Sequence, residues 1–139
     1  MDQVQFEKLD LNNAKRKIQV TDFLNQFDLN YTDVDTTIIA TIENEIVGVC
    51  SKLNNLIKNI AIGEEYSGMN LTNSLITMMV KEIFTNGYDN AFVITKFINK
   101  QIFTSLNFKK IYENDVIVFL ALKNQTYLDY KKNDPKFRV

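Results

Sequence analysis

The fold is decided by residues 56–84, LIKNIAIGEEYSGMNLTNSLITMMVKEIF. Along this segment the pattern of apolar residues changes from one typical of a strand to one typical of a helix. The isoleucine-rich segment 56–62 predicts a strand, and the polar segment 63–70 predicts a loop. A helix follows, and its expected apolar face is made by Leu71, Leu75, Met78, Met79, Ile83 and Phe84. Asn86-Gly87 is expected to end this helix, because glycine is the usual residue just beyond a helix C-terminus.

This strand–loop–helix unit predicts an anion site. A loop that enters a helix directly from a strand exposes unpaired backbone N–H groups at the helix N-terminus. Together with the helix dipole, these groups suit an anion such as a pyrophosphate. Gly68 is the glycine of the turn, where a small residue lets the backbone approach a phosphate closely. The alternative interpretation is an ordinary β–α loop that binds nothing.

The flanking segments complete a mixed α+β domain. Before the unit, we expect a helix through the first thirty residues, with Val20, Phe23, Leu24 and Phe27 on one face, and a hairpin of strands at 36–42 and 46–53. After it, we expect a buried strand at 91–95, a short helix at 99–106 and a last strand or hairpin at 108–122. Strand–helix–strand order implies a right-handed crossover and local parallel pairing, whereas hairpins imply antiparallel pairing. The prediction is therefore a mixed, twisted sheet with helices on both faces.

Composition excludes several classes of function. The 139 residues carry a net charge of −1, which leaves no electrostatic footprint for nucleic acid and no basic membrane anchor. No apolar run is long enough to span a membrane, and the acidic, polar N-terminus leads us to expect no signal peptide. There is no histidine, so His-bound metals and His general bases are excluded, and we expect no metal site. The single cysteine, Cys50, is expected to be a buried, inert thiol in a cytoplasmic protein.

Two segments carry a resemblance to a known superfamily. The segment 60–76, IAIGEEYSGMNLTNSLI, is similar to the acetyl-CoA loop of the Gcn5-related N-acetyltransferases (GNAT), and 102–108, IFTSLNF, is similar to their late helix-to-strand turn. The element order matches as well, over residues 1–122. The resemblance implies the GNAT acyl-CoA N-acyltransferase fold, acetyl-CoA as the cofactor and an amine or protein as the acceptor.

The pyrophosphate motif of that superfamily, Gln/Arg-x-x-Gly-x-Gly/Ala, is replaced here. Its three positions hold Ser67, Asn70 and Thr72. Side chains at Asn70 and Thr72 would crowd the phosphates. Alternatively, the backbone path survives, because Asn tolerates positive φ and Thr can cap a helix.

The superfamily's catalytic groups are also replaced. Its general-acid tyrosine falls on Phe103, which has no proton to donate, and its catalytic glutamate falls near Lys58 and Asn59. Tyr66, in the loop, is the remaining weak candidate for a catalytic acid, and the competing interpretation is an aromatic that packs the loop. The turn glycine is replaced by Asn107, which also tolerates positive φ.

A closer resemblance covers nearly the whole chain. Segments 33–62 and 93–108 are similar to the N-terminal domain of citrate lyase ligase, with matches at Ile57-Lys58, Ala61, Thr95-Lys96 and Phe103. That family uses ATP and acetate to acetylate the prosthetic-group thiol on the acyl carrier subunit of citrate lyase. Its adenylating domain has an H-x-G-H motif. This chain has no histidine, so ATP would act only through an absent C-terminal domain.

The resemblances together imply a binding site and a division of the chain. Residues 1–122 would form the GNAT-like domain, and 123–139 a basic helical stub or linker toward the absent nucleotidyltransferase domain. The expected ligand is acetyl-CoA or a phosphopantetheine-type arm, presented free or by the carrier subunit. The expected binding residues are Ile60, Ala61, Ile62, Gly68, Met69, Asn70, Leu71, Thr72, Asn73 and Lys96. The alternatives are a stand-alone acetyl-CoA-dependent N-acetyltransferase and a domain without activity that only orients its neighbour.

Overall fold

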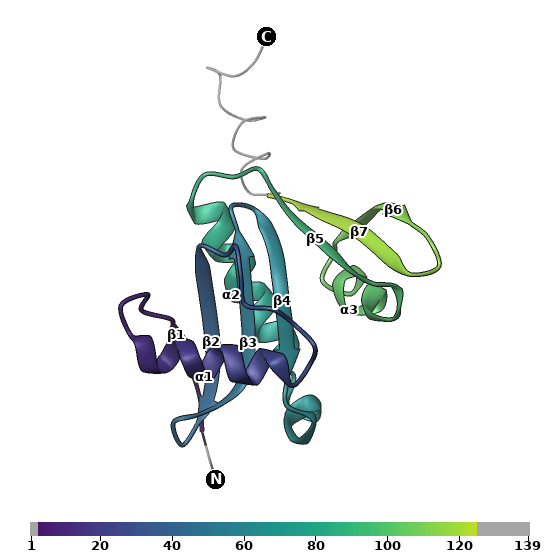
Figure 1. Ribbon diagram of the computed structural model, residues 1–139. Helices are drawn as coiled ribbons and strands as arrows, with labels where there is room; N and C mark the ends of the chain where they lie inside the picture. Colours follow the sequence, from purple (N-terminus) through teal and green to yellow (C-terminus); the bar gives the residue numbers. More distant parts are fainter. Residues whose placement is uncertain (1–2, 125–139) are drawn as a thin grey trace.

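A computed structural model describes residues 3–124, which form a mixed seven-stranded sheet with helices on both faces (Figure 1). The strands are β1 (Val4–Lys8), β2 (Thr36–Ile42), β3 (Glu45–Leu53), β4 (Leu56–Ile62), β5 (Asn90–Lys96), β6 (Lys109–Glu113) and β7 (Ile117–Lys123). The helices are α1 (Ala14–Asn25), α2 (Leu71–Thr85) and α3 (Lys100–Thr104), with the 3-10 helices η1 (Glu64–Met69) and η2 (Phe97–Asn99).

The sheet order is β1-β2-β3-β4-β5-β7-β6. Only β4 and β5 pair in parallel among these neighbours, and α2 connects them, as the strand–helix–strand pattern predicts. The last segment is a hairpin of β6 and β7, in whose turn the Asn114 side chain accepts the N–H groups of Val116 and Ile117. The predicted mixed sheet with helices on both faces is therefore confirmed.

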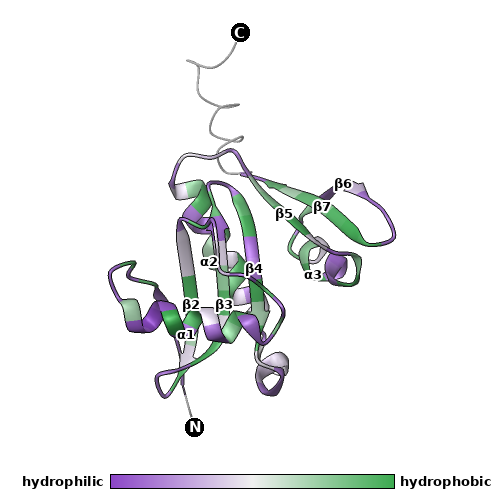
Figure 2. Cartoon of the chain, in the orientation of Figure 1, coloured by the Kyte–Doolittle hydropathy of each residue, from purple (hydrophilic) through white to green (hydrophobic). Residues whose placement is uncertain are grey.

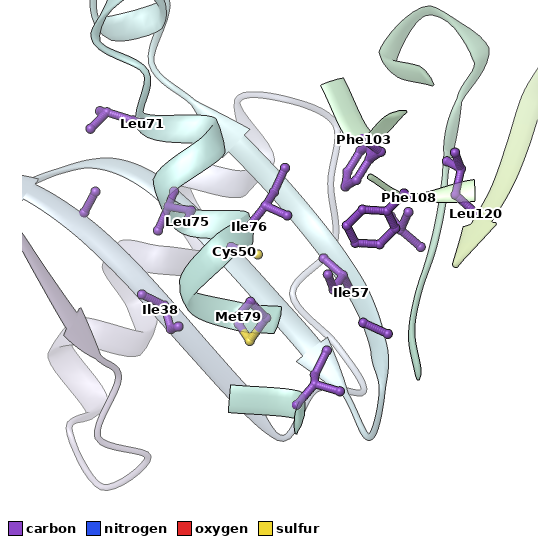
Figure 3. Close-up of a cluster of buried hydrophobic side chains, with 14 of the residues drawn as sticks. Ile38, Cys50, Ile57, Leu71, Leu75, Ile76, Met79, Phe103, Phe108 and Leu120 are labelled. Atoms are coloured by element: carbon purple, nitrogen blue, oxygen red, sulfur yellow. The ribbon is translucent and has the colours of Figure 1, made fainter. Parts of the chain in front are cut away.

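Each face of the sheet has its own apolar cluster, because neighbouring residues in a strand point to opposite faces. Ile38 packs in the cluster under α2, and the next residue, Ile39, packs in the cluster under α1. Figure 3 shows the cluster under α2, which also includes Phe103 of α3 and Phe108, just before β6. We call the two sides of the sheet the α1 face and the α2 face.

The predicted helix through the first thirty residues is wrong in its first part. Residues Val4–Lys8 form β1, which pairs antiparallel with β2. Val4 and Phe6 alternate with exposed residues and pack on the α2 cluster, which is a strand pattern five residues long. The helix begins only after Asn13, whose side chain accepts the N–H of Arg16 at 3.0 Å.

Three smaller differences concern the loop before α2, α2 itself and the last residues of the domain. The segment predicted as a loop contains η1. In α2, Met78 is 38% exposed, and Ile76 is buried in its place. Residues 125–139 of the predicted stub or linker lie outside the described residues, and Lys123 belongs to β7.

Candidate functional site

The centre of the sheet opens into a groove because β4 and β5 pair over only two residues. Leu56 pairs with Phe92 and Ile57 with Val93, and beyond them β4 stays with β3 while β5 stays with β7. The two strands diverge from that point, as Figure 1 shows. A groove of about 530 Å³ lies in this opening.

The walls of the groove come from segments far apart in the sequence. The loop after α1 supplies Phe27 and Leu29, and the start of α2 supplies Thr72. The strand β4 supplies Ile57, Lys58, Asn59, Ile60, Ala61 and Ile62. The opposite wall is made by Val93, Ile94, Thr95, Lys96, Asn99, Ile102, Phe103 and Ile117. The lining is mainly apolar with a few polar groups, which is the usual character of a small-molecule site.

A β-bulge interrupts β4 where it lines the groove. Val49 pairs with Ala61 and Ser51 with Lys58, so two residues of β4 oppose the single residue between them on β3. One of the two, Asn59, has φ of 53°, and its side-chain amide donates to the carbonyl of Asn30 at 3.2 Å. A bulge leaves backbone groups outside the ladder, so β4 has hydrogen-bonding capacity beside the groove.

The N-terminus of α2 adjoins the groove through Thr72. Asn70 precedes the helix in the left-handed conformation, with φ of 62°, as its tolerance of positive φ allows. No side chain caps the backbone N–H groups here, and the first turn holds no acidic residue. The Asn70 side-chain oxygen instead accepts the Asn73 amide at 2.9 Å. The first N–H groups of α2 therefore have neither an intrahelical acceptor nor a side-chain cap.

The structure brings half of the predicted binding residues to the groove. Ile60, Ala61, Ile62, Thr72 and Lys96 line it. The others are distributed around the start of α2. Asn70, Leu71 and Asn73 form the helix start, with Leu71 buried beneath it, whereas Gly68 and Met69 lie in η1.

The structure leaves open space around Gly68. A Cβ atom on Gly68 would meet no other atom within 4 Å, and its φ is not positive. The residue with positive φ before α2 is Asn70. The positive φ that the sequence analysis considered for Asn70 is therefore present.

The two aromatic candidates for the general-acid position have different surroundings. Tyr66 is half-buried, packs against the α2 cluster and is not among the residues that line the groove. Phe103 is 2% exposed, lines the groove and meets the Phe108 ring edge-on, with 5.4 Å between ring centroids. Of the two positions, the structure puts only that of Phe103 at the groove.

Sequence reasoning missed most of the apolar lining. Phe27 and Leu29 follow α1, and Ile94 and Ile117 come from the neighbouring strands β5 and β7. Phe27 was expected on the apolar face of the first helix, but α1 ends at Asn25 and Phe27 lies beyond it at the groove. The register that pairs Ile94 with Phe119 and Lys96 with Ile117 has no signal in the local sequence.

Within residues 3–124, other chemistry has little support. Burial raises the pKa of the Cys50 thiol to about 12, so the thiol is protonated at neutral pH. No group of three His, Cys, Asp or Glu side chains in this range is placed to hold a metal ion. None of the helices described is both long and apolar enough to cross a membrane.

The fold is similar to that of solved GNAT acetyltransferase structures. No protein-family model matches the sequence, and no curated protein gives a significant sequence match. Solved structures do match. One is an aminoglycoside 6'-N-acetyltransferase complexed with coenzyme A, with a TM-score of 0.74 at 11% identity over 86% of this chain and 96% of that chain.

Two bacterial enzymes give the same result. A GNAT-family acetyltransferase from Staphylococcus aureus has a TM-score of 0.68 at 15% identity, over 87% of this chain and 99% of that one. The IAA acetyltransferase from Bacillus cereus has a TM-score of 0.64 at 18% identity, with the same coverage. At these identities the similarities show the fold alone.

Proposed function

We propose that the groove between β4 and β5 binds acetyl-CoA or a phosphopantetheine-type arm, and that the chain transfers the acetyl group to an amine. The observation that carries this proposal is the continuity of the groove with the uncapped, acid-free start of α2. Pyrophosphate oxygens suit those N–H groups, and a pantetheine chain suits the bulged, mainly apolar β4 wall. The fold's similarity to an acetyltransferase complexed with coenzyme A supports the same assignment. A cytoplasmic location goes with this proposal.

The chemistry asked of the chain is acyl transfer to nitrogen. The amine lone pair attacks the thioester carbonyl carbon, the carbon–sulfur bond breaks, and the departing CoA sulfur receives the proton that nitrogen loses. Among the described residues that line the groove there is no Tyr, Cys, Asp or Glu. The chain would therefore contribute mainly position and environment. Lys58 and Lys96 favour the neutral, reactive form of a nearby amine, because like charges lower the pKa of an ammonium.

Thr72→Glu tests the cofactor site without weakening the helix. A glutamate in the first turn of a helix is stabilising, by about 0.3–1 kcal/mol. The same charge beside the groove should repel the phosphates of CoA and weaken its binding by at least about tenfold. Isothermal titration calorimetry with acetyl-CoA measures the affinity, and thermal unfolding checks that the variant is folded.

Two variants are matched controls for Thr72→Glu. Thr72→Gln has similar bulk without the charge and should weaken binding much less. Thr77→Glu makes the same charge change at an exposed position in the middle of α2 and should leave the affinity unchanged. If Thr72→Glu binds acetyl-CoA as well as the wild-type chain does, the phosphates do not bind at the start of α2.

A second candidate is the domain of citrate lyase ligase that receives the phosphopantetheine-type arm of the carrier subunit. One observation favours it: the residues that carry that resemblance all line the groove. They are Ile57, Lys58, Ala61, Thr95, Lys96 and Phe103. On this proposal the chain binds the arm, and ATP-dependent chemistry belongs to a separate domain. Titration with the loaded carrier subunit and with free acetyl-CoA separates the two candidates, since a carrier-specific domain binds the first much more tightly.

A further inference from the structure

The charged side chains of the groove have one sign. Lys58 and Lys96 are its only charged residues among those described, and no Asp or Glu is part of the lining. Each ion pair within 4 Å in residues 3–124 joins other residues, so neither ammonium has a carboxylate partner there. The Lys58 ammonium donates only to a carbonyl, that of Asp33, at 3.3 Å. Both lysines therefore keep their capacity to bind an added anion.

Both lysines belong to the α1 face of the sheet. Ile57 and Val93 pack in the α2 cluster, and neighbouring strand residues point to opposite faces. Lys58 follows Ile57 directly, and Lys96 is three residues beyond Val93, so both project to the α1 face. The acceptor of the Lys58 hydrogen bond, in the segment between α1 and β2, is consistent with this placement.

Apolar side chains surround the lysines on the same face. Ile94 is 52% exposed and alternates with Val93, and Ile117 alternates with the buried Val118. Phe27 and Leu29 complete this wall from the segment after α1. Figure 2 shows β5 and β7 coloured hydrophobic over most of their length. The α1-face mouth of the groove is therefore an apolar surface with two cations.

From these observations we infer that the acetyl acceptor is an amine that carries a carboxylate beside an apolar body, such as an amino acid with an apolar side chain. This inference rests on the proposed acetyl transfer. The carboxylate would pair with the Lys58 and Lys96 ammonium groups, and the apolar body would contact the Ile94 and Ile117 wall. A polyamine or another polycation is disfavoured, because it meets two positive charges and no negative one.

The lysines are poorly placed for the cofactor phosphates. A pyrophosphate at the start of α2 lies beside Thr72 and the end of β4 at Ile62. Lys58 pairs with Ser51 and Ile62 with Gly48, three residues apart on β3, which is about 10 Å at the usual rise per strand residue. Lys96 lies on the wall of the groove opposite β4, away from Thr72. It also borders a second, more open depression that Asp115 lines. The expected contact of Lys96 with the cofactor stays a prediction, which the variants below also test.

The test measures the binding of three acceptors to the wild-type chain saturated with CoA. L-Phenylalanine carries a carboxylate and an apolar body, and phenethylamine carries the apolar body without the carboxylate. Spermidine carries only positive charges. Saturation-transfer NMR titrations give the dissociation constants without requiring turnover. Phenylalanine should bind about tenfold more tightly than phenethylamine, and spermidine most weakly. Added NaCl should reduce the preference, because salt screens exposed charges.

Variants assign the effect to the lysines. Lys58→Met and Lys96→Met should each remove most of the carboxylate preference while the CoA affinity stays unchanged, and Lys96→Glu should shift the preference toward phenethylamine. Lys81→Met, at an exposed site on α2, is the control and should change neither affinity.

Equal or tighter binding of spermidine overturns the inference, as does CoA binding with no binding of phenylalanine. Loss of CoA affinity in Lys96→Met returns that lysine to the cofactor site. Failure of the wild-type chain to bind CoA overturns the proposed function itself, and this inference with it.

Discussion

The pair of Lys52 and Asp35 supports the segment that carries part of the groove wall. The Lys52 side chain is 3% exposed, and its ammonium lies 2.7 Å from the Asp35 carboxylate and 3.1 Å from the carbonyl of Asn54. The same carboxylate accepts the Asn54 N–H at 2.6 Å and the Thr36 hydroxyl at 3.0 Å. Asp35 thereby ties the segment between α1 and β2 to the turn between β3 and β4.

The two partners of this pair should respond unequally to substitution. Asp35→Asn keeps the size of the side chain but removes its charge and one acceptor oxygen, which leaves a buried ammonium without a counter-charge. Breaking a fully buried pair costs about 3–5 kcal/mol, and the 38% exposure of the Asp35 side chain reduces the expected loss to about 2–3 kcal/mol. Lys52→Met should cost about 1 kcal/mol or less, because the carboxylate left behind is hydrated and keeps its other donors.

Thermal and urea unfolding of the two variants measure this difference. Asp35→Asn should lower the Tm by roughly 6–15 °C for a chain of this size, and Lys52→Met by much less. Burial raises the pKa of Asp35, but hydrogen bonds from Lys52, Asn54 and Thr36 outweigh it, and the pKa is lowered overall. The stabilisation is therefore present above the unfolded pKa, about 3.9, and is lost as the pH falls through the lower folded value. Equal losses in the two variants, or a difference between wild type and Asp35→Asn that persists in strong acid, would refute this account.

Two further predictions concern the groove and the core. Phe103→Tyr places a proton donor at the groove, where the resemblance implies a general acid, and should raise the rate of the proposed acetyl transfer on the order of 10²-fold, measured as release of free CoA thiol. An unchanged rate with intact acetyl-CoA binding would place the acid elsewhere. Cys50 is fully buried, so a thiol reagent should label it only as fast as the chain unfolds, and labelling should accelerate with urea in step with loss of structure. Rapid, complete labelling of the native chain would contradict the buried position of the thiol.

The fold was predictable from local patterns, because each long element has its own period. Three patterns are too long to arise readily by chance: the strand-like runs at 36–42 and 56–62, and the apolar stripe of α2. The strand β1 was not predictable, because five residues in a polar N-terminus give only two apolar positions, Val4 and Phe6. Its place in the sheet is decided by pairing with β2, which is a tertiary interaction.

The site was predictable only where it follows the chain in order. The path from Ile60 to Thr72 is one continuous β–α unit, so the sequence could indicate it as a binding element. The opposite wall depends on where β4 and β5 stop pairing, after two residue pairs. That divergence and the bulge at Asn59 are tertiary features, and residues as distant in sequence as Phe27, Ile94 and Ile117 line the groove together.

The composition of the groove also bears on the choice between the two proposed functions. Both use the same arm, and they differ in what the chain must do at the thioester. Receiving an arm requires only the β4 wall and the start of α2, whereas acetyl transfer requires a neutral amine beside the thioester. The lysine pair supplies a reason for the amine to be neutral, and Phe103 supplies no proton to the leaving sulfur. A transferase built in this way should depend on solvent for that proton, so the acceptor preference of the groove is a more direct test of its function than its turnover rate.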